Sequence, residues 1–120
     1  MKLESKFYNE LKRITPKIRW TRLENSSVLG TPDLLGYNIH QHFFTVELKV
    51  ANGNKVRLSP HQISFHIRHP ENTFILVKTK DACRLYLGKQ VRELFACGCS
   101  LAPVACGWKN VRLWLESLGQ

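Results

Sequence analysis

The segment Phe43–Val50 constrains the fold most, because its residues fall into two sets that alternate along the chain. The side chains of a β-strand point alternately to its two faces. One face would then carry only apolar side chains, from Phe44, Val46, Leu48 and Val50. The other face would carry Phe43, Thr45, Glu47 and Lys49. The segment therefore predicts a strand that buries one face in a core and presents an acid and a base side by side on the other.

The residues before this strand predict a helix and two further strands. Apolar residues recur at helical spacing in Leu3–Ile14, and Pro16 ends the pattern. The segment Lys17–Leu23 alternates basic and apolar side chains, which is typical of a half-buried strand. Because proline cannot donate to a β-ladder, Pro32 should stand at the beginning of a strand. Asp33 would then lie at a strand start.

A helix should begin after the first long strand, where Ser59 and Pro60 are typical of an N-cap and a first helical residue. We expect this helix to run to about His69. Helical spacing predicts that its core-facing side chains are Ile63 and Ile67. An adjacent polar stripe would consist of Gln62, His66 and His69.

The rest of the chain predicts two strands and two helices. The strands are Thr73–Lys80 and Ala82–Leu87, and the helices are Lys89–Ala96 and Trp108–Leu118. The apolar run within the first of these strands is typical of burial on both faces. A chain of 120 residues has the size of one compact domain with one core. We therefore expect residues 1–120 to form a single α/β domain with a mixed β-sheet flanked by helices.

The net charge restricts the class of binding partner. The chain has 18 Lys and Arg against 9 Asp and Glu, which gives a formal net charge of +9. A surface this basic attracts polyanions such as nucleic acid or anionic lipid, although small basic proteins also include ribosomal and merely soluble ones. The first residues form no signal-peptide core, and no apolar run reaches the length of about 20 residues that spans a membrane. We therefore expect a cytoplasmic protein with no membrane partner and with reduced cysteines.

Three charged residues suggest phosphodiester hydrolysis. This reaction needs a divalent cation on a phosphate oxygen, a water made more acidic, and cationic groups where negative charge grows. Mg²⁺ takes oxygen ligands and needs only one or two carboxylates besides water and the substrate's phosphate. Asp33 and Glu47 would meet at one ion if their strands form a hairpin, with Lys49 on the face of Glu47. Taken alone, Glu47 and Lys49 are more typical of a charge pair on a solvated sheet face.

The context of these residues resembles a known nuclease signature. Thr31-Pro32-Asp33, followed after thirteen intervening residues by Glu47-Leu48-Lys49, resembles the motif of the PD-(D/E)XK nuclease superfamily. Leu58-Ser59-Pro60-His61-Gln62 is similar to the L-S-P-x-Q that opens the next helix in VRR-NUC domains and related small phage nucleases. Glu4 is similar to the first-helix glutamate of Holliday junction resolvase-like members. The resemblance implies a restriction-endonuclease-like fold, and a location in the host cytoplasm if a phage encodes the chain.

The resemblance also implies a metal site. Asp33 and Glu47 would bind Mg²⁺, for which Mn²⁺ can substitute, and the backbone carbonyl of Leu48 would be a further ligand. Glu4 would complete the site. Because Glu10 lies on a nearby stripe of the same helix, the choice between the two glutamates stays open at this point.

The implied reaction is an endonucleolytic cut of DNA that leaves a 5′-phosphate and a 3′-hydroxyl. Asp33, Glu47, Lys49 and Gln62 would be the catalytic residues. Lys49 would act on the nucleophilic water, and Gln62 would orient that water or a phosphate of the cut strand. No small-molecule cofactor is implied.

Basic side chains around this site are expected to contact DNA phosphates, although each is individually more typical of a plain surface charge. They are Arg13, Lys17, Arg19, Arg22, Lys55, Arg57, His61 and Arg68. Since one site cuts one strand, we expect a homodimer that cuts both. The substrate stays open between a Holliday junction or other branched DNA and plain duplex. Two alternative functions also remain, a noncatalytic DNA-binding module on the same fold and an RNA-binding or ribosome-associated protein.

The cysteines and histidines suggest other metals only weakly. The spacing of Cys97, Cys99 and Cys106, with Cys83 upstream, does not form a pair of zinc knuckles, so we expect free or buried thiols. The histidines near the site lack the further partners that a histidine metal centre needs.

Overall fold

The computed structural model describes residues 3–23 and 29–120, and for Leu3 and Glu4 it describes the backbone alone. The helices are α1 (Leu3–Ile14), α2 (Pro60–Arg68), α3 (Val91–Cys97) and α4 (Trp108–Ser117). The strands are β1 (Arg19–Arg22), β2 (Leu34–Tyr37), β3 (Phe43–Val50), β4 (Thr73–Lys78), β5 (Cys83–Leu87) and β6 (Ala105–Cys106). Short 3-10 helices at Gly88–Gln90 and Gly98–Ser100 flank α3. None of the helices within these ranges is long and apolar enough to cross a membrane.

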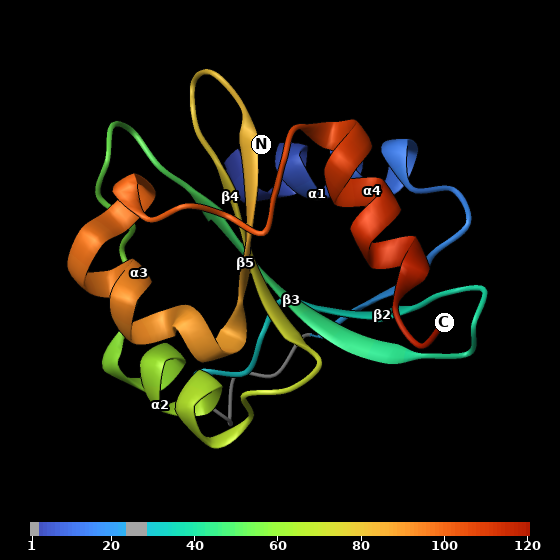
Figure 1. Ribbon diagram of the computed structural model, residues 1–120, viewed down its shortest axis with the longest axis horizontal. Coiled ribbons are helices and arrows are strands. Elements are labelled where there is room, and N and C mark those ends of the chain that lie inside the picture. Colours follow the sequence, from blue (N-terminus) through green and yellow to red (C-terminus); the bar gives the residue numbers. More distant parts are fainter. Residues whose placement is uncertain (1–2, 24–28) are drawn as a thin grey trace.

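The six strands form one mixed sheet in the order β1-β2-β3-β4-β5-β6 (Figure 1). All neighbouring strands are antiparallel except β3 and β4, which are parallel. Parallel neighbours need a crossover connection, because a tight hairpin reverses the chain. The loop after β3 and helix α2 provide that connection, so α2 begins beside the end of β3.

Helices cover both faces of the sheet and divide the core into two clusters (Figure 1). On one face, the apolar side chains of β3 pack against α1 and α4; this cluster includes Phe7, Leu11, Phe44, Val46, Leu48, Val111 and Leu115. On the other face, β4 and β5 pack against α2 and α3; this cluster includes Ile63, Ile75, Val77, Tyr86, Val91 and Leu94. The sequence-based prediction of a mixed sheet flanked by helices is therefore confirmed.

The strand register assigns Glu47 and Lys49 to the second face. Glu47 is paired with Ile75 and Lys49 with Val77, and paired residues on neighbouring strands point to the same side of a sheet. Towards the other end of β3, Phe43 points to this face as well and is 58% exposed. The cover of this face therefore decreases along β3 from the buried Glu47 to the exposed Phe43.

Most of the predicted elements are confirmed, and the errors lie in helix orientation and in one short strand. The bounds of α1 and β3 agree with the predicted ones, and α2 begins with Pro60 after a Ser59 N-cap. The predicted core position of Ile67 is wrong, because Ile67 is 41% exposed while His66 is fully buried. Helix α2 is rotated so that His66, and not Ile67, points to the sheet. Strand β6 was not predicted.

Candidate active site

The hairpin of β2 and β3 brings Asp33 next to Glu47. Leu34 is paired with Val46, so the residue before Leu34 stands opposite the residue after Val46. Asp33 Oδ2 accepts a hydrogen bond from the backbone N–H of Leu48 at 2.8 Å. The backbone carbonyl of Asp33 accepts from Leu23 N at 2.8 Å, which continues the pairing of β1 with β2. The first hydrogen bond holds the Asp33 carboxylate against β3, and the second holds the Asp33 backbone beside β1.

The carboxylate of Glu47 is buried, with 3% of the residue exposed. Its Oε2 lies 3.9 Å from Nζ of Lys49, which is 21% exposed. Burial of a charged carboxylate is costly unless charged or hydrogen-bonding groups surround it. The ammonium of Lys49 supplies the charge, so the acid and base predicted to share one strand face do interact.

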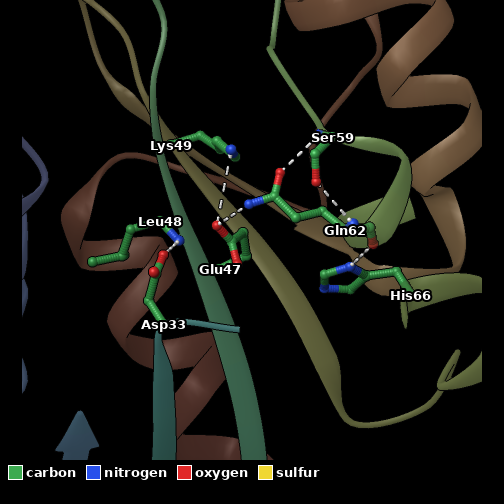
Figure 2. Close-up of polar contacts among 7 residues, drawn as sticks. All are labelled: Asp33, Glu47, Leu48, Lys49, Ser59, Gln62 and His66. Atoms are coloured by element: carbon green, nitrogen blue, oxygen red, sulfur yellow. Dashed lines mark hydrogen bonds and ion pairs between the residues drawn. The ribbon is translucent and has the colours of Figure 1, made fainter. Parts of the chain in front are cut away.

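Gln62 connects the capping of α2 to this carboxylate (Figure 2). Its side-chain Oε1 accepts from Ser59 N at 2.9 Å, and its backbone N–H donates to Ser59 Oγ at 3.1 Å, which forms a capping box. With Oε1 held in this way, the amide Nε2 donates to Glu47 Oε2 at 3.0 Å. The amide nitrogen of Gln62 is thus directed at Glu47.

A close backbone approach fixes the start of α2 beside the segment that leads to Asp33. Gly30 has φ +85°, and a Cβ at this position would lie 2.3 Å from the carbonyl oxygen of His61. Only glycine tolerates both the left-handed conformation and this contact. The first turn of α2, which carries Gln62, and the approach to Asp33 are therefore packed against each other.

His66 lies one turn beyond Gln62, and its burial disfavours the charged form. Its Nδ1 donates to the carbonyl oxygen of Gln62 at 2.8 Å. Its Nε2 is buried and has no hydrogen-bond partner among the residues that the structure describes. Burial lowers the pKa of His66 below its ordinary value, and the nearby His69 acts in the same direction. His66 is therefore a packed core residue and not part of an exposed polar stripe.

A pocket of about 490 Å³ adjoins these side chains. It is lined by Lys49, Lys55, Arg57, Leu58, Gln62 and Phe95, among others. In the segment before α2, Val56 and Leu58 are buried and alternate with Lys55 and Arg57, which are exposed. Two of the predicted phosphate-contacting residues are thereby brought to the side of Lys49.

The other predicted DNA-contacting residues are exposed but are spread over the surface. The guanidinium of Arg22 lies 5.5 Å from the ring centroid of Tyr8 in α1, on the face of the sheet opposite to Glu47. Arg13 lies in the last turn of α1. Arg19 is paired with Tyr37, on the Glu47 face but at the far end of β2. The remaining ones are Lys17, in the turn before β1, and His61 and Arg68, at the two ends of α2.

Glu10 does not take part in this site. Its carboxylate forms an ion pair with Lys78 and accepts from Trp108 Nε1 at 3.2 Å. Lys78 is paired with Val50 and Cys83, which belong to the α1 and α4 face of the sheet. The side chain of Glu4 lies outside the part of the chain that the structure describes.

The donor atoms at the hairpin fit a hard divalent cation. Among the described residues, no group of three His, Cys, Asp or Glu side chains is gathered as a metal centre. Asp33 and Glu47 do stand opposite each other on one face of the hairpin, however, and Mg²⁺ often binds through only one or two carboxylates. Because the N–H and C=O of one strand residue point to the same neighbour, the Leu48 carbonyl lies on the Asp33 side. The oxygen-rich donor set that the sequence suggests is compatible with this geometry.

The cysteines are free thiols, and none of them lines the pocket beside Lys49. Cys83 is buried, and Cys97 and Cys106 are exposed. Burial raises the pKa of Cys83 to about 11, with a further contribution from the neighbouring Cys106. A thiol with such a pKa is protonated near neutral pH and is a poor nucleophile.

The sequence did not indicate the part of the pocket that comes from the second half of the chain. Phe95 lies in the helix predicted at Lys89–Ala96, for which no exposed or buried face was predicted, and Phe95 is 52% exposed. Helical spacing could have indicated that Phe95 is exposed, because Val91 and Leu94, three positions apart, already form the buried side of this helix.

No protein-family model, no curated protein and no solved structure gives a match to this chain. A function must therefore be inferred from the geometry and chemistry of its own residues.

Proposed function

We propose that this chain is a metal-dependent endodeoxyribonuclease that hydrolyses DNA phosphodiester bonds to a 5′-phosphate and a 3′-hydroxyl. The observation that carries the proposal is the position of Asp33, Glu47 and Lys49 beside Leu48, on the face of the sheet against which α2 packs. We further propose that the mixed sheet with its flanking helices is a restriction-endonuclease-like fold. The order of β2, β3 and α2 supports this, because it places the proline-aspartate start, the E-x-K strand and the glutamine together.

Asp33, Glu47 and the carbonyl of Leu48 would hold Mg²⁺ or Mn²⁺ in this proposal. A bound divalent ion supplies Lewis-acid chemistry, since it polarises a phosphate oxygen and acidifies a water ligand. Glu47 is held by two donors, Lys49 and Gln62, so its carboxylate keeps one orientation. Asp33 is fixed by the N–H of Leu48. A rigid pair of carboxylates lowers the reorganisation needed when a cation binds.

Lys49 and Gln62 act on the groups around the reacting phosphate. The ammonium of Lys49 lines the pocket and can donate to the attacking water and to the oxygens on which negative charge grows. Gln62 also lines the pocket, while its amide nitrogen orients Glu47. We therefore assign Lys49 a catalytic role and Gln62 a positioning role toward Glu47.

Positive charge around the pocket supports DNA as the partner. Lys49, Lys55 and Arg57 lie together, and the whole chain has a net charge of +9. Phosphate contacts of this kind position a nucleic acid without reading its sequence. Since the described part of the chain holds one such site, cutting both strands needs two copies, and we propose a homodimer that cuts either branched DNA, such as a four-way junction, or plain duplex.

The decisive experiment is a cleavage assay on supercoiled plasmid and on a synthetic four-way junction. The wild type is compared with Lys49→Ala and Asp33→Asn in Mg²⁺, in Mn²⁺ and with chelator. We expect cutting only by the wild type and only with a divalent ion, with 5′-phosphate ends detected by ligation.

Two results would contradict the proposal. Cutting by both variants at the wild-type rate would remove this mechanism. Binding of the junction by the wild type without any cutting would favour a noncatalytic DNA-binding module.

A further inference from the structure

Phe95 presents an aromatic ring to the pocket beside the proposed active site. It is 52% exposed, while Val91 and Leu94 on the same helix are 1% and 0% exposed. Helix α3 is thus anchored in the core without Phe95. A large apolar side chain left at the wall of a polar pocket has a free face for a ligand.

The pocket combines this ring with three cationic side chains. Lys49, Lys55 and Arg57 line the same space of about 490 Å³, which is within the range of small-ligand sites. Unpaired nucleic acid is bound in this way, since bases stack on aromatic rings while the backbone follows positive charge. The chemistry therefore fits one nucleotide, with its base on Phe95 and its phosphate against the cations.

Hydrogen bonds fix the two walls of the pocket relative to each other. The carbonyl oxygen of Asn54 accepts from Cys99 N at 2.7 Å, and Asn54 Nδ2 donates to Cys97 O at 2.9 Å. Gly98 has φ +63°, and a Cβ there would lie 2.2 Å from the Asn54 oxygen. The loop with Lys55 and Arg57 is therefore joined closely to the end of α3, and the pocket is formed before a ligand binds.

We propose that this pocket binds one unpaired nucleotide of the DNA strand next to the bond that is cut. The inference rests on the nuclease function proposed above and names its substrate class as DNA with a single-stranded or splayed segment. A nucleotide inside a duplex has both faces of its base stacked on neighbours, so it offers no face to Phe95. Flaps, single strands and branch points with unpaired bases do.

Equilibrium binding with chelator present tests the pocket without any cutting. The probes are a fluorescein-labelled single-stranded oligonucleotide and the same sequence as a blunt duplex. We expect the wild type to bind the single strand more tightly. Phe95→Ala should weaken single-strand binding about 10-fold or more, as loss of one base stack does, and should change duplex binding little. Phe95→Trp should restore the affinity, because it restores a ring.

Leu113→Ala is the matched control. Leu113 is 46% exposed on α4, which packs on the other face of the sheet. This variant should bind both probes as the wild type does, and circular dichroism checks that each variant is folded.

The outcomes separate the pocket from the catalytic proposal. Equal single-strand affinity of Phe95→Ala, Leu113→Ala and the wild type would contradict nucleotide binding at the pocket. If Lys49→Ala still lost cutting in that case, the nuclease function would remain supported. Single-strand binding that depends on Phe95, without cutting by the wild type in Mg²⁺ or Mn²⁺, would overturn the nuclease and keep the nucleotide pocket.

Discussion

The amide of Gln62 donates to the carboxylate of Glu47 at 3.0 Å while its oxygen caps helix α2. One side chain thus couples the start of a helix to the orientation of a buried acid on β3. Because the capping box fixes Oε1, the amide nitrogen is the group left to face Glu47. The geometry of the proposed site therefore depends on a local helix signal.

Replacing Gln62 should affect stability and cutting, whereas replacing its capping partner should affect mainly stability. Gln62→Ala removes the cap acceptor and a donor to a buried carboxylate, which should cost about 1–3 kcal/mol of unfolding free energy. Ser59→Ala removes only the other half of the cap, at a cost of about 1 kcal/mol. Urea unfolding and initial cleavage rates measure the two effects. Equal cleavage rates of the two variants would show that Gln62 has no positioning role.

Replacing Lys49 should slow cutting far more than replacing a lysine on the neighbouring strand. Lys49→Ala should lower kcat by at least about 100-fold, a typical loss for a residue that assists proton transfer. Lys78→Ala is the control, because Lys78 pairs with Glu10 on the opposite face. Single-turnover cleavage of the four-way junction measures both. Similar rates for the two variants would exclude a catalytic role for Lys49.

Replacing Asp33 by asparagine should abolish metal binding without disturbing the hairpin. The Asp33→Asn side chain would keep an oxygen that can accept from Leu48 N–H, but would lose the charge. For the wild type, Mn²⁺ at about ten times its Kd should stabilise the fold by about 1.4 kcal/mol. Thermal unfolding with and without Mn²⁺ should show this rise in Tm for the wild type and none for Asp33→Asn. An equal rise in both proteins would place the ion elsewhere.

Removing the charges of Lys55 and Arg57 should reduce the salt dependence of DNA binding. Each phosphate contact contributes a slope of about −0.7 for single strands and about −0.9 for duplex in a plot of log K against log salt. The double change Lys55→Gln and Arg57→Gln should make the slope less steep by up to twice these values. Lys109→Gln, on the exposed side of α4, should leave it unchanged. Fluorescence anisotropy titrations over a range of salt concentrations measure the slope.

The stability of the fold should fall below about pH 6.5 because of His66. Burial lowers the pKa of His66 in the folded state below its ordinary value of 6.5. When the pH is below 6.5, the unfolded chain therefore binds a proton at this histidine more readily than the folded chain does. The free energy of unfolding has its full value with respect to His66 above pH 6.5. It decreases as the pH falls towards the pKa of the folded state, by at most about 1.4 kcal/mol per pH unit. Urea unfolding at several pH values should show this slope in the wild type, and a shallower slope in His66→Phe.

Local patterns determined most of the elements and the central part of the candidate site. The alternation in Phe43–Val50 predicted which face of β3 is apolar and which carries Glu47 and Lys49, and both faces are confirmed. The capping sequence likewise predicted where α2 begins. Such features depend on residues two to four positions apart, so their physical cause is contained in a short stretch of chain.

Contacts between distant segments required the tertiary structure. Glu10 pairs with Lys78 only because α1 packs on the sheet, and this ion pair shows that Glu10 is not part of the candidate site. The inward position of His66 follows from the rotation of α2 against the sheet, and Asn54 meets Gly98 only when the loop after β3 reaches α3. These contacts depend on strand order and on the orientation of whole helices, which many residues determine together. Sequence spacing alone carries no information about them, because it describes neighbours along the chain and not neighbours in space.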